Sequence, residues 1–216
     1  LVGIAQGHLL CGELDAAASA LDRADSFTSP LATSWSTRER ARAWLRAGRG
    51  ALAGARAILG PVAAPAREDG LWNFECGVVH DLVRFGDPGA AISRLTELAA
   101  VVDGPYVVAL AQHARAAVAG DRELYARAVD LLGALPCYVL AAEASLELAD
   151  LHRRAGTARD AAAATRRAQH LVEAAGGALT SGLRRGDTVE PLSERAREVA
   201  LLAAGGMASR GIAARL

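Results

Sequence analysis

Five glycines recur at nearly regular intervals along the chain, and each one separates an apolar stretch from a run of small residues. These glycines are Gly12, Gly48, Gly86, Gly120 and Gly156, so the successive intervals are 36, 38, 34 and 36 residues. A period of this length is typical of arrays in which each repeat is one pair of helices that buries its apolar face only against its neighbours. The repeat therefore predicts a row of helix pairs.

The composition also favours helices. Apolar residues make up 52% of the chain but aromatic residues only 4%, so the interior has to be built mainly from alanine and leucine. These two residues lead the helix propensity scale, whereas the aromatic residues that favour strands are scarce. We predict an all-α fold.

Positions counted from each glycine fit a pair of helices. Glycine suits the turn because the end of a helix often needs a positive φ, which glycine adopts without steric cost. Five residues later a small side chain would let the second helix approach the first, and nine residues later an apolar side chain would face the same seam. The first of these positions holds Ala17, Ala53, Ala91, Tyr125 and Ala161, and the second holds Leu21, Ala57, Leu95, Val129 and Thr165.

With this period and these seam residues, residues 1–175 resemble a degenerate tetratricopeptide array, an α-solenoid of helical hairpins. An alanine-rich helical bundle with glycines placed by chance is the alternative, since the large aromatic residues of that repeat are mostly absent. The expected helix pairs are 1–11 with 13–25, 36–47 with 51–59, 71–85 with 88–101, 105–119 with 121–132, and 138–155 with 158–175. Turns are expected at Ser29-Pro30, Gly60-Pro61, Pro65, Asp103-Gly104-Pro105 and Pro136.

Residues 176–191 differ from the array in composition. The stretch GGALTSGLRRGDTVEP is rich in Gly, Ser, Thr and charge and has no apolar period. Such a composition is typical of flexible linkers. We therefore expect a linker between the array and residues 192–216.

Charge and cysteine content limit the classes of function. The chain has 24 basic and 24 acidic residues, no lysine and a net charge of zero, which predicts no polyanion-binding surface across the array. Cys11, Cys76 and Cys137 lack C-x-x-C spacing, which favours reduced thiols over disulfides or zinc. Because no signal peptide and no apolar run of roughly 18 residues is present, we expect a soluble cytoplasmic protein that does not contact the membrane.

Residues that could carry catalysis form no recognisable pattern. The histidines are His8, His80, His113, His152 and His170, and their spacing favours surface or interhelical hydrogen bonds over metal binding. Neither His80-Asp81 nor Glu75-Cys76 is expected to act as an acid–base pair, because neighbours on a helix point about 100° apart. A P-loop sequence is absent from these residues. We predict that this chain is not an enzyme and holds no cofactor or metal.

The few large aromatic residues allow two interpretations. They are Trp35, Trp44, Trp72, Phe74, Phe85, Tyr106 and Tyr138, together with Phe27 and Tyr125. They could line a ligand or peptide groove on the concave face of a solenoid. They could instead fill gaps that alanine leaves in the core, which is the interpretation that we favour. The arginine clusters at 38–46 and 153–167 are balanced by acids or lie on solvated helix faces, and they argue only weakly for nucleic acid.

The most specific motif is the segment LSERAREVALLAAGGMASRGIAARL at residues 192–216. Ser193 can cap a helix, and a second helix follows the pair Gly205-Gly206. The core of the motif would consist of Leu192, Val199, Leu202, Ile212, Ala213 and Leu216. The residues that recur in a known family in this register are Leu192, Ser193, Arg195, Glu198, Val199, Gly206, Ile212, Ala213 and Leu216.

In this register the segment resembles the first half of the helix-turn-helix of LuxR-type transcription regulators. By that resemblance the second helix crosses the DNA backbone and the next helix reads the major groove. Ser209 and Arg210 would then contact phosphate, which positions a domain without reading bases. The segment departs from the family at Ala196, Ala208 and Gly211, where it lacks the usual capping and helix-favouring residues.

An array followed by this motif resembles the large ATP-binding LuxR regulators, which implies a longer parent protein with an ATP-binding module before the array. The resemblance implies a bacterial transcription regulator, in which a small-molecule inducer or protein partner on the array controls promoter binding by paired, oligomerised domains. Two alternatives stay open. One is a helical-repeat scaffold that binds proteins but not DNA, and the other is a helical ligand sensor without a DNA reader.

Overall fold

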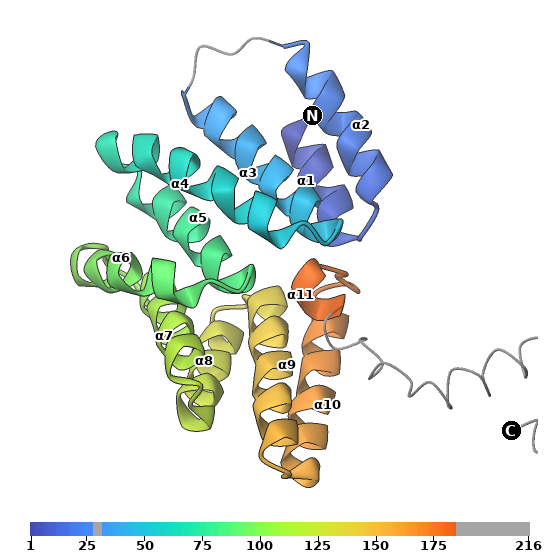
Figure 1. Ribbon diagram of the computed structural model, residues 1–216, viewed down its shortest axis with the longest axis vertical. Coiled ribbons are helices and arrows are strands. Elements are labelled where there is room, and N and C mark those ends of the chain that lie inside the picture. Colours follow the sequence, from blue (N-terminus) through green and yellow to red (C-terminus); the bar gives the residue numbers. More distant parts are fainter. Residues whose placement is uncertain (28–31, 185–216) are drawn as a thin grey trace, which may run out of the picture. The chain divides into compact units, whose positions relative to one another are not determined.

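The computed structural model describes residues 1–27 and 32–184, apart from the side chains of residues 32–34. These ranges contain helices and turns and no strand, which confirms the all-α prediction. Comparison with the sequence shows that five consecutive helix pairs form where the glycine period places them (Figure 1).

Each pair consists of two helices that follow one another and pack together. The pairs are α1 (Val2–Leu10) with α2 (Leu14–Asp25), α3 (Ala32–Gly48) with α4 (Leu52–Glu68), α5 (Trp72–Arg84) with α6 (Pro88–Val101), α7 (Pro105–Ala119) with α8 (Arg122–Ala134), and α9 (Tyr138–Arg154) with α10 (Ala158–Ala174). Neighbouring pairs also pack, through α2 with α3, α4 with α5, α6 with α7 and α8 with α9. The described helices thus form a sequential array.

The turns inside the pairs share one hydrogen-bond pattern. In each turn a glycine has positive φ, and the next residue donates its N–H to the carbonyl five residues before it, as Glu13 does to His8 and Asp87 to Leu82. This arrangement satisfies carbonyls that the end of a helix leaves without a partner. The glycine period therefore has a local cause, which is the positive φ that the helix end requires.

The glycine predicted for the turn of the second helix pair was assigned wrongly. Gly48 is the last residue of α3, and the glycine with positive φ is Gly50, at +84°. Counting from Gly50 places Ala55 and Leu59 at the seam, where both are buried, whereas Ala53 is exposed. The prediction failed because the sequence offers two glycines here and only the turn geometry distinguishes them.

Two predicted turns are also absent. Helix α4 continues through Pro61 and Pro65 as far as Glu68, although proline removes a backbone donor within a helix. Pro61 is exposed, while Val62 and Ala66 are fully buried against neighbouring helices. Burial of this face offsets the lost hydrogen bonds, so tertiary packing overrides the local signal.

Alanine dominates the contacts between the helices of a pair. Ala17, Ala91 and Ala161 lie five residues after their glycines and are at most 5% exposed, as predicted, and Tyr125 takes this place in the fourth pair. Because alanine lacks atoms beyond Cβ, the helix backbones approach closely along these seams. Leu95, Leu98, Leu110 and Leu132 fill the wider parts of the core.

The stretch expected to be a linker folds onto the array over its first half. Residues 178–184, which we call the C-terminal strap, include the short helix α11 (Ser181–Arg184). Ala178 and Leu183 are buried, and the Leu179 N–H donates to the Leu10 carbonyl over 2.7 Å. The composition alone suggested a linker because few of these residues are apolar. Residues 185–191 lie outside the described part of the chain.

Candidate functional site

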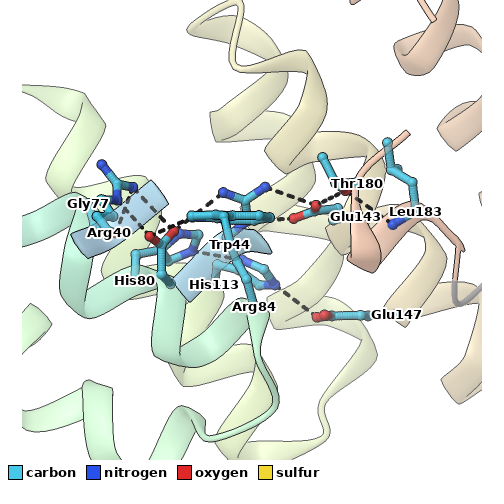
Figure 2. Close-up of polar contacts among 11 residues, drawn as sticks. Arg40, Trp44, Gly77, His80, Arg84, His113, Glu143, Glu147, Thr180 and Leu183 are labelled. Atoms are coloured by element: carbon cyan, nitrogen blue, oxygen red, sulfur yellow. Dashed lines mark hydrogen bonds and ion pairs between the residues drawn. The ribbon is translucent and has the colours of Figure 1, made fainter. Parts of the chain in front are cut away.

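The predicted DNA-contacting residues, Ser209 and Arg210, lie outside the described residues. The same holds for the predicted helix-turn-helix core of Leu192, Val199, Leu202, Ile212, Ala213 and Leu216. The structure therefore leaves the assignment of residues 192–216 as a prediction. Within the described residues, chemically distinctive side chains instead gather between the first helices of successive pairs, α3, α5, α7 and α9 (Figure 2).

Asp81 on α5 is the centre of the first part of this cluster. Its side chain is 1% exposed and accepts hydrogen bonds from Arg40 Nε over 2.6 Å and from Trp44 Nε1 over 2.8 Å. Arg40 Nη2 also donates to the carbonyl of Gly77, one turn before Asp81. A Cβ at Gly77 would lie 3.0 Å from Arg40 Nη1, so glycine gives the guanidinium room against α5. Arg40 and Trp44 are one turn apart on α3 and hold the same carboxylate.

Arg84 on α5 extends the cluster to α9 and to the C-terminal strap. Its Nε and Nη2 donate to the two oxygens of Glu143 over 2.7 and 2.9 Å, a bidentate pair in which both side chains are less than 10% exposed. Glu143 also accepts a hydrogen bond from the Thr180 hydroxyl of the strap. One continuous set of polar contacts thus connects α3, α5, α9 and the strap.

The Arg84 guanidinium is also stacked on an aromatic ring. Its Cζ lies 4.0 Å from the centroid of the Trp44 ring, and Trp44 meets Phe85 edge to face with 4.8 Å between ring centroids. A planar guanidinium can use its edge for a carboxylate and its face for a ring at the same time. Trp44 and Phe85 therefore fill space around a buried charge as well as within the apolar core.

Electrostatics keep both arginines charged. Burial works against the charge of Arg84, but Glu143 and Asp81 outweigh it and raise the pKa of Arg84 above its ordinary value. Burial likewise opposes the charge of Arg40, and Asp81 raises its pKa. Two guanidiniums and two carboxylates make a cluster with no net charge, which removes much of the cost of burying them.

His80 lies beside Asp81 in the sequence but faces a different helix. Its Nε2 is 3.0 Å from Nδ1 of His113 on α7, and Nε2 of His113 is 2.9 Å from Glu147 on α9. Because a carboxylate only accepts, His113 donates through Nε2, and its Nδ1 faces Nε2 of His80. Burial, and then the neighbouring His113, hold the pKa of His80 well below its ordinary value. The prediction of an interhelical role for these two histidines is confirmed.

Glu75 forms a second buried ion-pair cluster at the other end of α5. Its side chain is 0% exposed and accepts from Arg94 Nε and Nη2 and from Arg67 Nε over 2.7 to 2.8 Å. Burial alone would raise the pKa of Glu75, but the hydrogen bonds from Arg94 and Arg67 lower it. The adjacent Cys76 points into the apolar core, where burial and then the charge of Glu75 raise its thiol pKa to about 11. The residues of the neighbour pairs Glu75-Cys76 and His80-Asp81 thus face different surroundings.

A cavity of about 230 Å³ adjoins the Asp81 cluster between α1, α3 and α5. Its walls are formed by Gln6, Leu9, Leu10, Arg40, Trp44 and Arg84. Apolar side chains of α1 thus face two guanidiniums and an indole ring. A second cavity of about 220 Å³ lies between α4, α5 and α6, beside Arg67 and Arg94. The arginines of the second cavity are directed at Glu75.

The aromatic residues divide between the two predicted roles. Trp44 and Phe85 fill space in the interior, as the favoured interpretation predicted. Trp35, Trp72 and Tyr106 are 40–45% exposed and remain available for contacts with other molecules. Arg40 belongs to an arginine cluster expected to be balanced by acids or to lie on solvated faces, and it is balanced by Asp81 on the facing helix.

Three members of the cluster were not singled out from the sequence, namely Arg84, Glu143 and Thr180. A signal was present for Arg84, since it stands among apolar residues in the run VVHDLVRF, where a charged side chain needs a buried partner. No comparable signal identifies the partner, because Glu143 is 59 residues away. No sequence signal distinguishes Thr180 from the polar residues around it.

Searches for other kinds of site and for related proteins add no assignment. In residues 1–27 and 32–184, no group of three or more His, Cys, Asp or Glu residues could hold a metal ion. No helix of this part of the chain is long and apolar enough to cross a membrane. Comparison with protein-family models, with curated proteins and with solved structures found no match.

Proposed function

We propose that the chain belongs to a bacterial transcription regulator, in which the helical array senses a ligand or partner and residues 192–216 begin a LuxR-type helix-turn-helix. The observation that carries this proposal is the ungapped register of the family residues at the C-terminus, from Leu192 to Leu216. A motif of this length in register is more specific than the array, because helix pairs serve many functions.

The array supports the proposal by its organisation. Helix pairs stacked in sequence offer a long surface and interhelical spaces for ligands or partners. The strap at the end of the described residues is held by the array through Thr180 and Leu179, and residues 185–191 connect it to the segment that resembles the DNA-binding motif. A change in the array could therefore reach the motif through a short segment of chain.

The encoding gene provides the first test. If residues 192–216 begin a LuxR-type domain, the codons that follow Leu216 should encode a continuation of the form S-x-x-T-V-x-x-H, which supplies the reading helix. A stop codon or an unrelated domain at this place would contradict the proposal and favour a scaffold.

DNA binding provides the second test. A protein that includes the continuation should select a promoter sequence in a gel-shift assay, whereas residues 1–184 should not. Arg210→Ala in that protein should weaken binding to all sequences alike and reduce the salt dependence by about one counterion, as expected for a phosphate contact. Loss of selectivity at one base pair would instead assign Arg210 to base reading.

A protein-binding scaffold is the second candidate. The observation that favours it is the exposure of Trp35, Trp72 and Tyr106, since exposed aromatic residues are enriched at protein interfaces. If this function is correct, replacing these residues by serine should abolish partner binding and leave the array folded.

A further inference from the structure

We propose that the cavity between α1, α3 and α5 binds a small carboxylic acid with an apolar body, and that binding loosens the C-terminal strap. The ligand site does not depend on the proposed function. Only the consequence for DNA binding rests on it, through residues 192–216.

The walls of the cavity define the chemistry of the ligand. Leu9 and Leu10 provide apolar surface on one side, and Trp44 lines the other. The volume, about 230 Å³, is below the roughly 300–1,000 Å³ of typical drug-sized sites, so the ligand has to be small. These features favour a compact apolar body, such as one aromatic ring.

Arg40 supplies the group that would recognise the carboxylate. Its Nε and Nη2 are engaged by Asp81 and Gly77, whereas its Nη1 has no hydrogen-bond partner among the described residues. The Arg40 side chain is 25% exposed and lines the cavity. A guanidinium with an unused N–H favours an anionic oxygen acceptor over a neutral one.

The contacts of Arg84 connect this cavity to the strap. Its hydrogen bond to Asp81 is long, at 3.4 Å, whereas its contacts with Glu143 are 2.7 and 2.9 Å. A carboxylate bound to Arg40 would weaken the hold of Arg40 on Asp81, and Asp81 would then attract Arg84 more strongly. Because one guanidinium contacts both carboxylates, a shift of Arg84 toward Asp81 would lengthen its contacts with Glu143, the carboxylate that holds the strap.

The contacts that hold the strap depend on the position of Glu143. Thr180 is 2% exposed and donates to Glu143, and its Oγ1 accepts from the Leu183 N–H. A Cβ at Gly182 would lie 2.7 Å from Glu143 Cδ, so the strap backbone rests directly on this side chain. Arg184 Nη2 adds a 3.3 Å contact with the Gly48 carbonyl at the end of α3. Displacement of Glu143 would therefore weaken the strap.

The ligand site is tested by titrating the 216-residue chain with benzoate and, separately, with its neutral analogue benzamide. We expect a saturable heat of binding for benzoate and a shift of the Trp44 indole N–H resonance, with benzamide at least about 10-fold weaker. No saturation below about 10 mM benzoate would overturn the site. Equal affinity for benzamide would overturn the assignment of the ligand as an acid.

Two cavity variants locate the binding. Gln6→Phe fills the cavity from α1 and should reduce benzoate affinity at least about 10-fold. Gln169→Phe, at an exposed position on α10, is the matched control and should leave the benzoate affinity unchanged. Leu10→Glu, at a half-exposed wall position, should repel benzoate but not benzamide, and Leu131→Glu is its control. Unchanged benzoate affinity in both cavity variants would overturn the location.

Hydrogen exchange measures the effect on the strap. Saturating benzoate should accelerate exchange of the Leu179, Leu183 and Arg184 amides at least about 3-fold, since these amides donate to Leu10 of α1 and to Thr180, and both sets of hydrogen bonds need the strap in place on the array. Unchanged or slower exchange in the bound protein would overturn the coupling. Benzoate binding and amide exchange are both measured on residues 1–184, so their outcome does not depend on whether residues 192–216 bind DNA.

Discussion

Helix α5 carries two buried carboxylates that are neutralised in different ways. Glu75 is paired with Arg67 and Arg94, whose side chains are 54% and 23% exposed, so water reaches the cations although it does not reach the anion. Asp81 is paired with Arg40 and with Arg84, and Arg84 is only 9% exposed. The same helix thus holds one buried carboxylate whose two cations both reach the surface and one that is paired in part with a buried cation, Arg84.

This difference indicates which part of the array is sensitive to substitution. Removing one partner of a buried ion pair leaves the other partner charged in a place that water does not reach. Where the removed partner was exposed, water can solvate the charge that remains. The Glu75 cluster should therefore tolerate substitutions that the Asp81 cluster does not. The Asp81 cluster is also the one beside a cavity and the strap, so the sensitive region coincides with the candidate site.

The largest expected effect is that of Arg84→Met. This change removes the cation that neutralises Glu143 and leaves Asp81 with Arg40 alone, and we expect a loss of about 3–5 kcal/mol in the free energy of unfolding. Urea denaturation measures it. Arg115→Met on the exposed face of α7 is the matched control and should change stability by less than about 0.5 kcal/mol. A small loss for Arg84→Met would show that the interior pair is dispensable.

Asp81→Asn should have the next largest effect. The substituted amide keeps one acceptor but presents an N–H group to Arg40 or Trp44, so we expect a loss of about 2–3 kcal/mol. Asp130→Asn, which disturbs only an exposed pair with Arg167, is the control. Intrinsic tryptophan fluorescence should also change, because the Trp44 indole loses its acceptor. An effect no larger than that of Glu75→Gln would contradict the comparison.

Glu75→Gln should cost less, about 1–2 kcal/mol at neutral pH, because its cations remain hydrated. Since the folded pKa of Glu75 is lowered, its contribution is fully present above the ordinary value of 4.5 and is lost as the pH falls through the folded pKa. The variant should therefore lose less stability than the original chain on acidification below pH 4.5. Parallel pH dependences would show that Glu75 is not ionised in the fold.

His80→Gln should have the smallest effect at neutral pH, about 1 kcal/mol, since glutamine can still donate to His113. The folded pKa of His80 is lowered, so its contribution is present above 6.5 and decreases as the pH falls below that value. Between pH 6.5 and about 5 the variant should lose less stability than the original chain. His170→Gln, at an exposed position on α10, should keep the original pH dependence.

Much of the array was predictable because its determinants are local. A glycine at a helix end and small residues five positions later recur in the sequence, and the turns and seams follow from them. One exception is local in origin and the other is tertiary. Gly48 and Gly50 compete for one turn, and two prolines within α4 are overridden by the buried face of that helix.

The helix pairs, their period and the alanine seams follow from the sequence, since propensity, turn chemistry and periodicity act over a few residues. Tertiary packing sets the remaining partners: Arg40 and Arg84 share Asp81, Glu143 accepts from Arg84, and Thr180 donates to Glu143. These partners are separated by 37 to 59 residues along the chain except for Asp81 and Arg84. Pairing at such distances depends on how the helices stack, which no local pattern encodes.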